Sequence, residues 1–154
     1  MYAIPVTAAC IVHAADEYKL PKQLIKAVMA EEGGWVGLAK RDSNGSIDYG
    51  PMQINSLWLK RLKPAGITAH MLRFNGCLNV TVGAWILSGI SRRTETYAQA
   101  LGYYHSSNYQ LAHKYVIHAE WAMRERSWKS IILGANRLFT HPVSASTGES
   151  HVSP

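Results

Sequence analysis

Apolar residues recur at helical spacing along most of the chain. Over residues 7–19 they occupy positions 8, 11, 12, 15 and 18, which lie on one face of a helix. Pro21 then predicts the start of a second helix, because its missing N–H needs no partner there. The same periodicity predicts helices over about 79–92, 97–105, 109–126 and 127–139. The last of these would carry an apolar face made of Trp128, Ile131, Ile132, Ala135, Leu138 and Phe139.

One segment breaks the helical pattern. Residues 40–55 contain Asn44-Gly45, a strong signal for a tight hairpin turn, followed by alternating small and larger residues. The sequence therefore predicts an α+β fold that is mostly α, with one small β-hairpin. Residues 140–154 are polar and rich in Pro and Ser, so we expect a disordered tail behind a single domain of residues 1–139.

Composition narrows the range of partners. The chain of 154 residues has a net charge of +6, which favours a polyanion such as nucleic acid, anionic lipid or an acidic cell-wall polymer. Lys and Arg are scattered, with small clusters at 60–63, 92–93 and 124–126, so a solvated basic surface is favoured over a nucleic-acid interface. No apolar run is long enough to span a membrane, and a monomer is expected.

The two cysteines, Cys10 and Cys77, show neither a CxxC motif nor a histidine at metal-ligand spacing, so no metal site is expected. They could form a disulfide or remain two buried thiols, and the residues leave both open. The N-terminal stretch "MYAIPVTAAC" has no basic residue and contains Pro5, which makes it a poor signal peptide. We expect either a mature chain whose leader has been replaced by Met1, or a protein not exported by that route.

The stretch "AVMAEEGGW" places Glu31 and Glu32 at the end of the second predicted helix, before two glycines. At 100° per residue, Glu31 lies at the edge and Glu32 near the centre of the apolar stripe formed by Leu24, Ile25, Val28 and Met29. Glu31 is expected to reach water. Burying an unpaired carboxylate is unfavourable, so Glu32 should favour its protonated form and could act as a general acid. The alternative is a structural ion pair between Glu32 and a Lys or Arg.

A second carboxyl group, Asp48, follows in the predicted hairpin, within "GSIDYGPMQIN". A helix followed by a hairpin can bring Glu32 and Asp48 into one cleft. Two carboxyl groups in unlike environments are what the cleavage of a glycosidic bond requires. Gln53 and Asn55 offer polar groups to sugar hydroxyls and amides, although plain polarity at a strand edge explains them as well.

Four ordered stretches, "AVMAEEGGW", "NGSIDYGPMQINSLWL", "GAWIL" and "ALGYYHSSN", resemble the lysozyme-like lytic transglycosylases of the soluble (SLT) type. The resemblance covers about residues 10–121 and is closest to members that accompany conjugation, secretion and pilus systems. It implies a lysozyme-like fold with the small β-hairpin beside the catalytic helix. It also implies cleavage of the β-1,4 bond between N-acetylmuramic acid and N-acetylglucosamine, leaving a 1,6-anhydro end, without a cofactor. Peptidoglycan strands and components of a secretion, conjugation or pilus machine are the implied partners.

Within this resemblance, Glu32 matches the catalytic acid/base of the family, and Tyr104 matches a tyrosine close to that acid. Asp48 is kept as a third candidate catalytic residue. The residues expected to line the glycan cleft are Gly50, Met52, Gln53, Asn55, Tyr103 and His105. For His105 the alternative is an exposed histidine at a helix end. For the aromatic residues Trp35 and Trp58, packing in the core is favoured over stacking on sugars.

Cys10 and Cys77 match a disulfide common among the secretion-associated members, which implies an oxidising periplasm. The chain departs from the family pattern where Gly33 stands in place of a serine, Pro51 in place of a leucine, and His105 in place of an asparagine. None of these departures removes the acid, although Gly33 removes a hydrogen bond that usually helps to position the cleft.

Two other functions remain open. The motifs also resemble c-type lysozymes, in which Asp48 would be the second catalytic carboxylate and water would resolve the intermediate. Those enzymes carry several disulfides, whereas this chain can form at most one. A non-catalytic wall-binding or assembly factor is the other possibility, with the amphipathic helix of residues 127–139 docking on a secretion component. Packing of that helix against its own domain is favoured.

Overall fold

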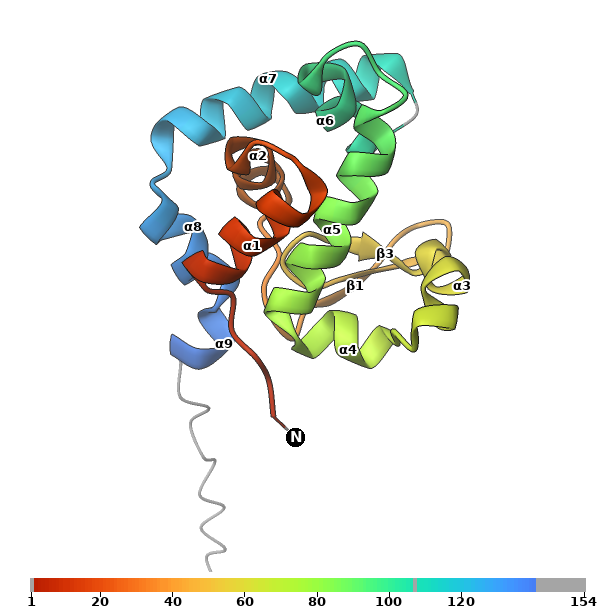
Figure 1. Ribbon diagram of the computed structural model, residues 1–154, viewed down its shortest axis with the longest axis vertical. Coiled ribbons are helices and arrows are strands. Elements are labelled where there is room, and N and C mark those ends of the chain that lie inside the picture. The colour runs from red at the N-terminus through yellow and green to blue at the C-terminus, as the bar shows by residue number, and fades with distance from the viewer. Residues whose placement is uncertain (1, 107, 141–154) are drawn as a thin grey trace, which may run out of the picture.

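Helices make up most of the structure, as the hydrophobic periodicity predicts (Figure 1). The structure is a computed structural model that describes residues 2–106 and 108–140. The predicted tail therefore lies outside the described residues, except for Thr140 at the end of the last helix. The helices in chain order are α1 Ala8–Tyr18, α2 Lys22–Glu32, α3 Leu59–Leu62, α4 Ala69–Phe74, α5 Gly76–Ser91, α6 Tyr97–His105, α7 Tyr109–Glu125, α8 Trp128–Ala135 and α9 Arg137–Thr140.

Three short strands form one antiparallel sheet in the order β1-β2-β3, with β1 Ala39–Arg41, β2 Ile47–Tyr49 and β3 Ile54–Asn55. The predicted hairpin corresponds to β1 and β2. Its turn is closed by a hydrogen bond from Asp42 N to Ser46 O at 2.9 Å, and Gly45 adopts a φ of +86°, which favours glycine. The structure adds the third strand, β3, which places Asn55 opposite Asp48.

The region between the sheet and α5 contains more helix than the sequence predicts. It holds α3, α4 and two short 3₁₀ turns, Ser56–Trp58 and Lys63–Ala65. Each of these elements is too short to show a full helical period of apolar residues. The sequence did contain one signal for the start of α4. Thr68 is the N-cap residue, and its side chain accepts a hydrogen bond from Met71 N.

The C-terminal segment is two helices, so the prediction of one helix over residues 127–139 is wrong. The chain leaves helical geometry at Asn136, between α8 and α9. The Asn136 side chain accepts a hydrogen bond from Val6 N and donates one to Val6 O, both at 2.7 Å. These two bonds join the segment before α1 to the C-terminal helices (Figure 1). Ile131 and Ala135 are buried, so α8 packs its apolar face within the domain, whereas Leu138 and Phe139 of α9 are exposed.

The helix α5 runs through the middle of the molecule, between α1 on one side and the sheet on the other (Figure 1). Its Gly83 allows the fully buried Met52 to pack directly on the helix, because a Cβ at Gly83 would overlap the Met52 sulfur. A disulfide between Cys10 and Cys77 joins the start of α1 to the start of α5. This confirms the pairing that the family resemblance implies. Closing a loop of this length stabilises a fold by about 4 kcal/mol.

Asn79 of α5 is fully buried although it is polar. Its Oδ1 accepts a hydrogen bond from Met52 N at 2.8 Å. Its Nδ2 donates to Tyr49 O at 2.8 Å and to Leu72 O at 2.9 Å. One side chain thus ties the end of β2, the loop between β2 and β3, and α4 to the central helix. Gly50 is required beside it, because any Cβ there would overlap Asn79 Nδ2.

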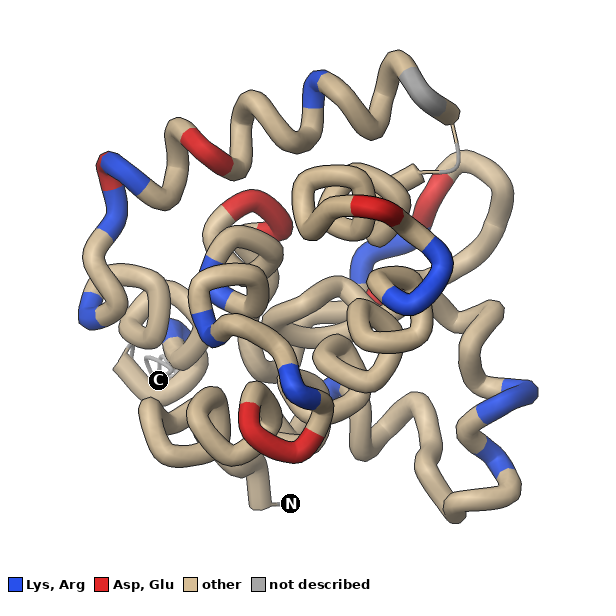
Figure 2. Tube along the Cα trace, turned by 45° about the horizontal axis from the view of Figure 1, so that its top comes forward, with Lys and Arg blue, Asp and Glu red and all other residues tan. Residues whose placement is uncertain are grey.

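Charged residues are spread over the molecule. Lys and Arg occur on most of the helices and on several turns without collecting on one face (Figure 2). This distribution is typical of a solvated basic surface rather than of a nucleic-acid stripe. Among the described residues, no helix is both long enough and apolar enough to cross a bilayer.

The first prediction concerns Asn79. Replacing Asn79 with Ala leaves Met52 N–H and the carbonyl groups of Tyr49 and Leu72 buried without partners. We expect the free energy of unfolding, measured by urea denaturation, to fall by about 3–5 kcal/mol. Asn79→Asp keeps the acceptor but not the donors, so it should also be destabilised. The control is Thr68→Ala, which removes an exposed cap and should cost about 1 kcal/mol. A loss for Asn79→Ala no larger than that of the control would contradict the role of the buried amide.

Candidate active site

The candidate site is built at the C-terminal end of α2, where Gly33 ends the helix with a φ of +56°. Arginines from the C-terminal part of the chain bind the carbonyl groups at this end. Arg126 donates to Ala30 O at 2.8 Å, and Arg137 donates to Gly33 O at 3.4 Å. Cationic groups stabilise the C-terminal end of a helix because the helix dipole is negative there. The turn that carries the two glutamates is therefore held from outside α2.

The helix α7 packs against α2 and partly covers both glutamates. The exposed fraction of the side chain is 21% for Glu31 and 16% for Glu32. Glu32 is the less exposed of the two, as the helical wheel predicts, but the difference is smaller than expected. The reason is that His118 of α7 reaches over the edge of α2 and places its Nδ1 3.5 Å from Glu31 Oε1.

Glu32 contacts two residues through one of its oxygens. The Tyr115 hydroxyl donates a hydrogen bond to Glu32 Oε1 at 3.0 Å, and His105 Nδ1 lies 3.8 Å from the same atom, at ion-pair distance. The His105 ring stacks on the Tyr115 ring, with centroids 4.6 Å apart and planes inclined by 13°. We call these three residues the carboxylate cluster. No Lys or Arg nitrogen in the described part of the chain lies within 4.0 Å of Glu32, so the ion pair with a Lys or Arg is not formed.

Electrostatic coupling within the carboxylate cluster follows from these distances. The Glu32 carboxylate raises the pKa of His105, while partial burial of the imidazole acts in the opposite direction. Burial raises the pKa of Tyr115, and the nearby negative charge of Glu32 raises it further. Tyr115 therefore remains a neutral hydrogen-bond donor across the physiological range of pH.

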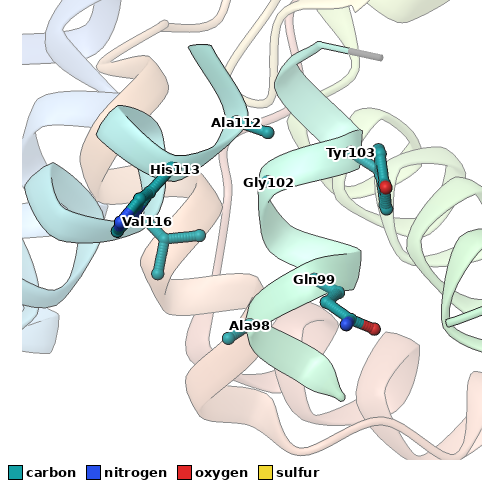
Figure 3. Close-up of a pocket in the computed structure, with 7 residues that line it drawn as sticks. All are labelled: Ala98, Gln99, Gly102, Tyr103, Ala112, His113 and Val116. Atoms are coloured by element: carbon teal, nitrogen blue, oxygen red, sulfur yellow. The ribbon is translucent and has the colours of Figure 1, made fainter. Parts of the chain in front are cut away.

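A close approach of α6 and α7 brings His105 and Tyr115 together. Gly102 of α6 faces Ala112 of α7, and Ala112 points toward α6 (Figure 3). A Cβ at Gly102 would lie only 3.0 Å from the Ala112 Cβ. His105 and Tyr115 each follow this contact by about one helical turn, so they meet on the same side of the helix pair. Tyr103 points away from α7, so it does not join the carboxylate cluster (Figure 3).

Tyr104 lies beside the candidate site, but its hydroxyl is not hydrogen-bonded to Glu32. Its hydroxyl donates a hydrogen bond to Met52 O at 2.9 Å. The hydroxyl that donates to Glu32 is that of Tyr115, on α7. Burial raises the pKa of Tyr104 well above its usual value, and the charges of Glu32 and Asp48 add to this effect. Tyr104 is thus close enough to both carboxyl groups for their charges to act on its hydroxyl.

Asp48 lies in β2 and is held by polar neighbours on the sheet. Asn55 of β3 donates from Nδ2 to Asp48 Oδ1 at 2.8 Å and to Ser46 Oγ at 2.8 Å. Burial raises the pKa of Asp48, and the charges of Asp42 and Glu32 act in the same direction, while the hydrogen bond from Asn55 lowers it. Asn55 therefore supports Asp48, so its amide group is already engaged within the protein.

The loop after β2 holds the remaining predicted cleft residues. Gln53 adopts a φ of +50° and donates from Nε2 to Gly50 O at 2.8 Å. Gly34 packs against this loop, because a Cβ at Gly34 would overlap Gly50 O. Gly50 and Met52 were expected to line the glycan cleft, but both are buried, so neither offers a side chain to a ligand. Their role is to connect the end of α2, the loop and Tyr104.

The two tryptophans named from the sequence contact the protein itself. Trp58 packs against the core and meets the Trp85 ring edge-on, with centroids 5.6 Å apart. The Trp35 ring lies under the Arg137 guanidinium at 4.0 Å. Within the residues that the structure describes, no group of three or more His, Cys, Asp and Glu side chains is arranged to hold a metal ion.

The sequence-based prediction missed two residues of the site, Tyr115 and Asn79. Tyr115 belongs to the buried face of α7. Apolar residues recur every three or four positions along that face, and this pattern could have predicted that Tyr115 points inward. The buried residues of that face are Ala112, Tyr115, Ala119 and Ala122. Asn79 has no such signal, because a polar residue among apolar ones on a predicted helix is ambiguous without its partners.

A family comparison identifies the domain. The family described as the Transglycosylase SLT domain matches residues 9–120. The chain belongs to this family. The match runs from α1 to near the end of α7, so it includes Glu32, the sheet and the whole carboxylate cluster. The predicted fold class, mostly α and lysozyme-like with a small sheet, is thereby confirmed.

Curated relatives agree with this assignment. Protein IpgF of Shigella sonnei is 39% identical over 82 residues, which are 53% of this chain and 54% of the relative. Invasion protein IagB of Salmonella typhimurium is 34% identical over 100 residues, 64% of this chain and 62% of the relative. Peptidoglycan-binding-like protein of Escherichia coli O157:H7 is 33% identical over 112 residues, 65% of each chain. The matches thus span about half to two thirds of these relatives.

The second prediction concerns the pH dependence of stability. Because the folded pKa of His105 is raised above its usual 6.5, its ion pair with Glu32 stabilises the fold fully below pH 6.5. That contribution is lost as the pH rises through the folded pKa. His105→Gln should therefore lower the melting temperature more at pH 6 than at pH 9. The pH-dependent part should be below about 1 kcal/mol, since a half-exposed pair is screened by solvent.

The control for this prediction is His13→Gln, since His13 lies at the same distance of 3.8 Å from Glu17 but is 76% exposed. Its effect should change little with pH. Loss of the ring stack in His105→Gln is independent of pH, so only the difference between the two pH values is diagnostic. An equal decrease at both values would show that the ion pair does not stabilise the fold.

The third prediction concerns Gly33, which replaces the serine of the family pattern. Because Gly33 has a φ of +56°, a side chain there is strained even though no atom lies within 4 Å of the added Cβ. Gly33→Ala should lower the free energy of unfolding by about 1 kcal/mol. Gly89→Ala adds the same methyl group in open space on α5 and should be neutral or stabilising by up to about 1 kcal/mol. Both are measured by denaturant unfolding, and equal values would contradict the argument.

Proposed function

We propose that this protein is a peptidoglycan lytic transglycosylase in which Glu32 is both the catalytic acid and the catalytic base. The observation that carries the proposal is the carboxylate cluster inside an SLT domain. Glu32 is partly buried at a helix end, is oriented by a neutral phenol, and has a titratable imidazole at ion-pair distance. A glycosidic bond is cleaved by an acid in such surroundings.

The first step follows from the arrangement of the Glu32 oxygens. Both contacts of the Glu32 carboxyl group, to Tyr115 and to His105, are made through Oε1. Oε2 is therefore the oxygen that carries the proton in the acid form. It gives this proton to the glycosidic oxygen as the bond to the anomeric carbon of N-acetylmuramic acid breaks. Positive charge builds on the sugar, and the departing sugar leaves with its hydroxyl restored.

In the second step the same group acts as a base. The Glu32 carboxylate takes the proton of the C6 hydroxyl of the muramic acid, and the C6 oxygen bonds to the anomeric carbon. The 1,6-anhydro ring closes without water, and Glu32 is again protonated. A hydrogen bond from Tyr115 stabilises the carboxylate between the two steps, as does a protonated His105. Tyr104 acts through the loop, because its hydroxyl fixes Met52 O.

The cell-wall role is proposed to be local. The relatives that match include an invasion protein, which supports opening of the wall for a secretion, conjugation or pilus apparatus. The disulfide between Cys10 and Cys77 supports an oxidising compartment such as the periplasm. The burial of the apolar face of α8 within its own domain favours an enzyme over a docking factor that works through that helix.

A lysozyme-type hydrolase is the second candidate, and Asp48 is the observation that favours it. Asp48 is coupled to the charge of Glu32 and is oriented by Asn55. In that mechanism Asp48 would stabilise or bond to the anomeric carbon, and water would complete the reaction. The two candidates differ in the product, which carries a reducing end if water takes part.

The fourth prediction tests both candidates with purified peptidoglycan and mass analysis of the released muropeptides. The wild-type protein should release products one water lighter than the reducing-end forms. Glu32→Gln keeps the size of the side chain but cannot exchange a proton, so release should fall by at least about 10²-fold. Glu31→Gln is the matched control on the same helical turn and should keep activity within a few fold.

Asp48→Asn separates the two mechanisms. A transglycosylase should retain anhydro products after this change, whereas a lysozyme should lose activity as it does with Glu32→Gln. Reducing-end products from the wild type would contradict the transglycosylase proposal. If Glu32→Gln released as much material as the wild type, the protein would not use this acid, and a binding role for the domain would follow.

A further inference from the structure

Three arginines and three aromatic residues line two adjoining pockets next to α6. The first pocket, of about 280 Å³, is lined in part by Trp58, Trp85, Arg61, Arg92 and Arg93. The second, of about 400 Å³, shares Trp58 and Arg93 with the first and reaches Tyr103. We call the combined depression the arginine groove. Tyr103 belongs to α6, the helix that also carries Tyr104 and His105.

In the part of the chain that the structure describes, the guanidinium groups of the arginine groove have no acidic partner. Within residues 2–106 and 108–140, no Asp or Glu oxygen lies within 4.0 Å of Arg61, Arg92 or Arg93. Arg92 donates one hydrogen bond to Ser88 Oγ, and Arg93 donates one to Gly89 O. Each guanidinium carries five N–H donors, so most of the donors remain for a ligand. Three positive charges around one groove strongly favour an anion there.

Arg61 is held in place before any ligand arrives. Its guanidinium carbon lies 5.2 Å from the centre of the Trp58 ring and 5.3 Å from the centre of the Trp85 ring. The two rings meet edge to face, so Arg61 packs on both. A side chain ordered in advance loses less entropy on binding, which increases affinity for a planar anion such as a carboxylate.

We infer that the arginine groove binds the carboxylates of the peptide stems that peptidoglycan carries on its muramic acid. This inference rests on the proposed function, since it names a second feature of the same substrate. Guanidinium groups pair with carboxylates through two parallel hydrogen bonds. The exposed edges of Trp58 and Tyr103 offer apolar surface to the sugar or to the stem. A neutral glycan strand alone would leave all three charges without partners.

The test measures equilibrium binding of soluble glycan strands in the Glu32→Gln background, so that no cleavage takes place. Three probes are compared: strands with their stems, strands with stems whose carboxylates have been amidated, and strands stripped of stems by an amidase and then amidated at the lactyl carboxylates that this exposes. Arg92→Gln combined with Arg93→Gln should lower affinity for the first probe by about tenfold or more. Affinity for the other two probes should change less than about twofold.

The matched control removes the same charge elsewhere. Arg124→Gln combined with Lys129→Gln neutralises two exposed residues at the end of α7 and the start of α8. It should leave binding of all three probes close to that of the parent. Arg61→Gln, which also removes the packed cation, should weaken binding of the stem-bearing probe alone. Melting temperatures of all variants are measured beside the binding curves to confirm that each is folded.

The outcomes separate this inference from the proposed function. An equal loss for stem-free strands would overturn the inference and make the groove a sugar subsite. An equal loss in the control would assign the effect to bulk charge, and no loss in any variant would remove the groove from substrate binding. If binding depends on stems and on Arg92 and Arg93 but the wild type releases no muropeptides, the groove stands and the transglycosylase proposal fails.

Discussion

The buried side chain of Asn79 is the constraint on which the site depends. Three backbone groups from separate elements, at Tyr49, Met52 and Leu72, meet on one carboxamide. In an interior without water, each of these groups needs a partner, so their positions relative to α5 are narrowly determined. Met52 also links this arrangement to α6, because its carbonyl oxygen accepts a hydrogen bond from Tyr104 of that helix. Asn79 thus acts through Met52 and Tyr104 on the position of α6 beside the sheet, and with it on the position of His105.

The packing of α6, α7 and α2 completes the site. Gly102 allows α6 to approach α7 closely, so that His105 and Tyr115 stack. The pair then lies over the end of α2 and engages a single oxygen of Glu32. The proposed mechanism requires Glu32 to give up a proton and later take one back, so both forms must be accessible. The arrangement satisfies this need by leaving the second oxygen of Glu32 without a partner among the described residues.

Much of the fold and part of the site could be predicted from the sequence. Helical periodicity placed α1, α2, α5, α6 and α7 within a few residues, and Asn44-Gly45 located the hairpin turn. Periodicity failed where elements are shorter than one period, as in α3 and α4. It also failed at Asn136, where the helix is interrupted. The Asn136 side chain is bonded there to Val6, more than a hundred residues away in the chain. Glu32 could be singled out because a carboxylate on an apolar stripe is unusual. Tyr115 was missed because an aromatic residue on an apolar stripe is not.

The replacement of the family serine by Gly33 has a physical explanation in the end of α2. The helix stops at Gly33 in a left-handed conformation, and two arginines bind the carbonyl groups there. The two arginines offset the negative end of the helix dipole at this point. Glu32 accepts its hydrogen bond from Tyr115 of α7, not from the residue that follows Glu32 in the chain. Contacts from distant parts of the chain thus hold the end of α2 and Glu32. Positioning of the acid therefore depends on the packing of α7, and any change that moves α7 relative to α2 acts directly on the acid.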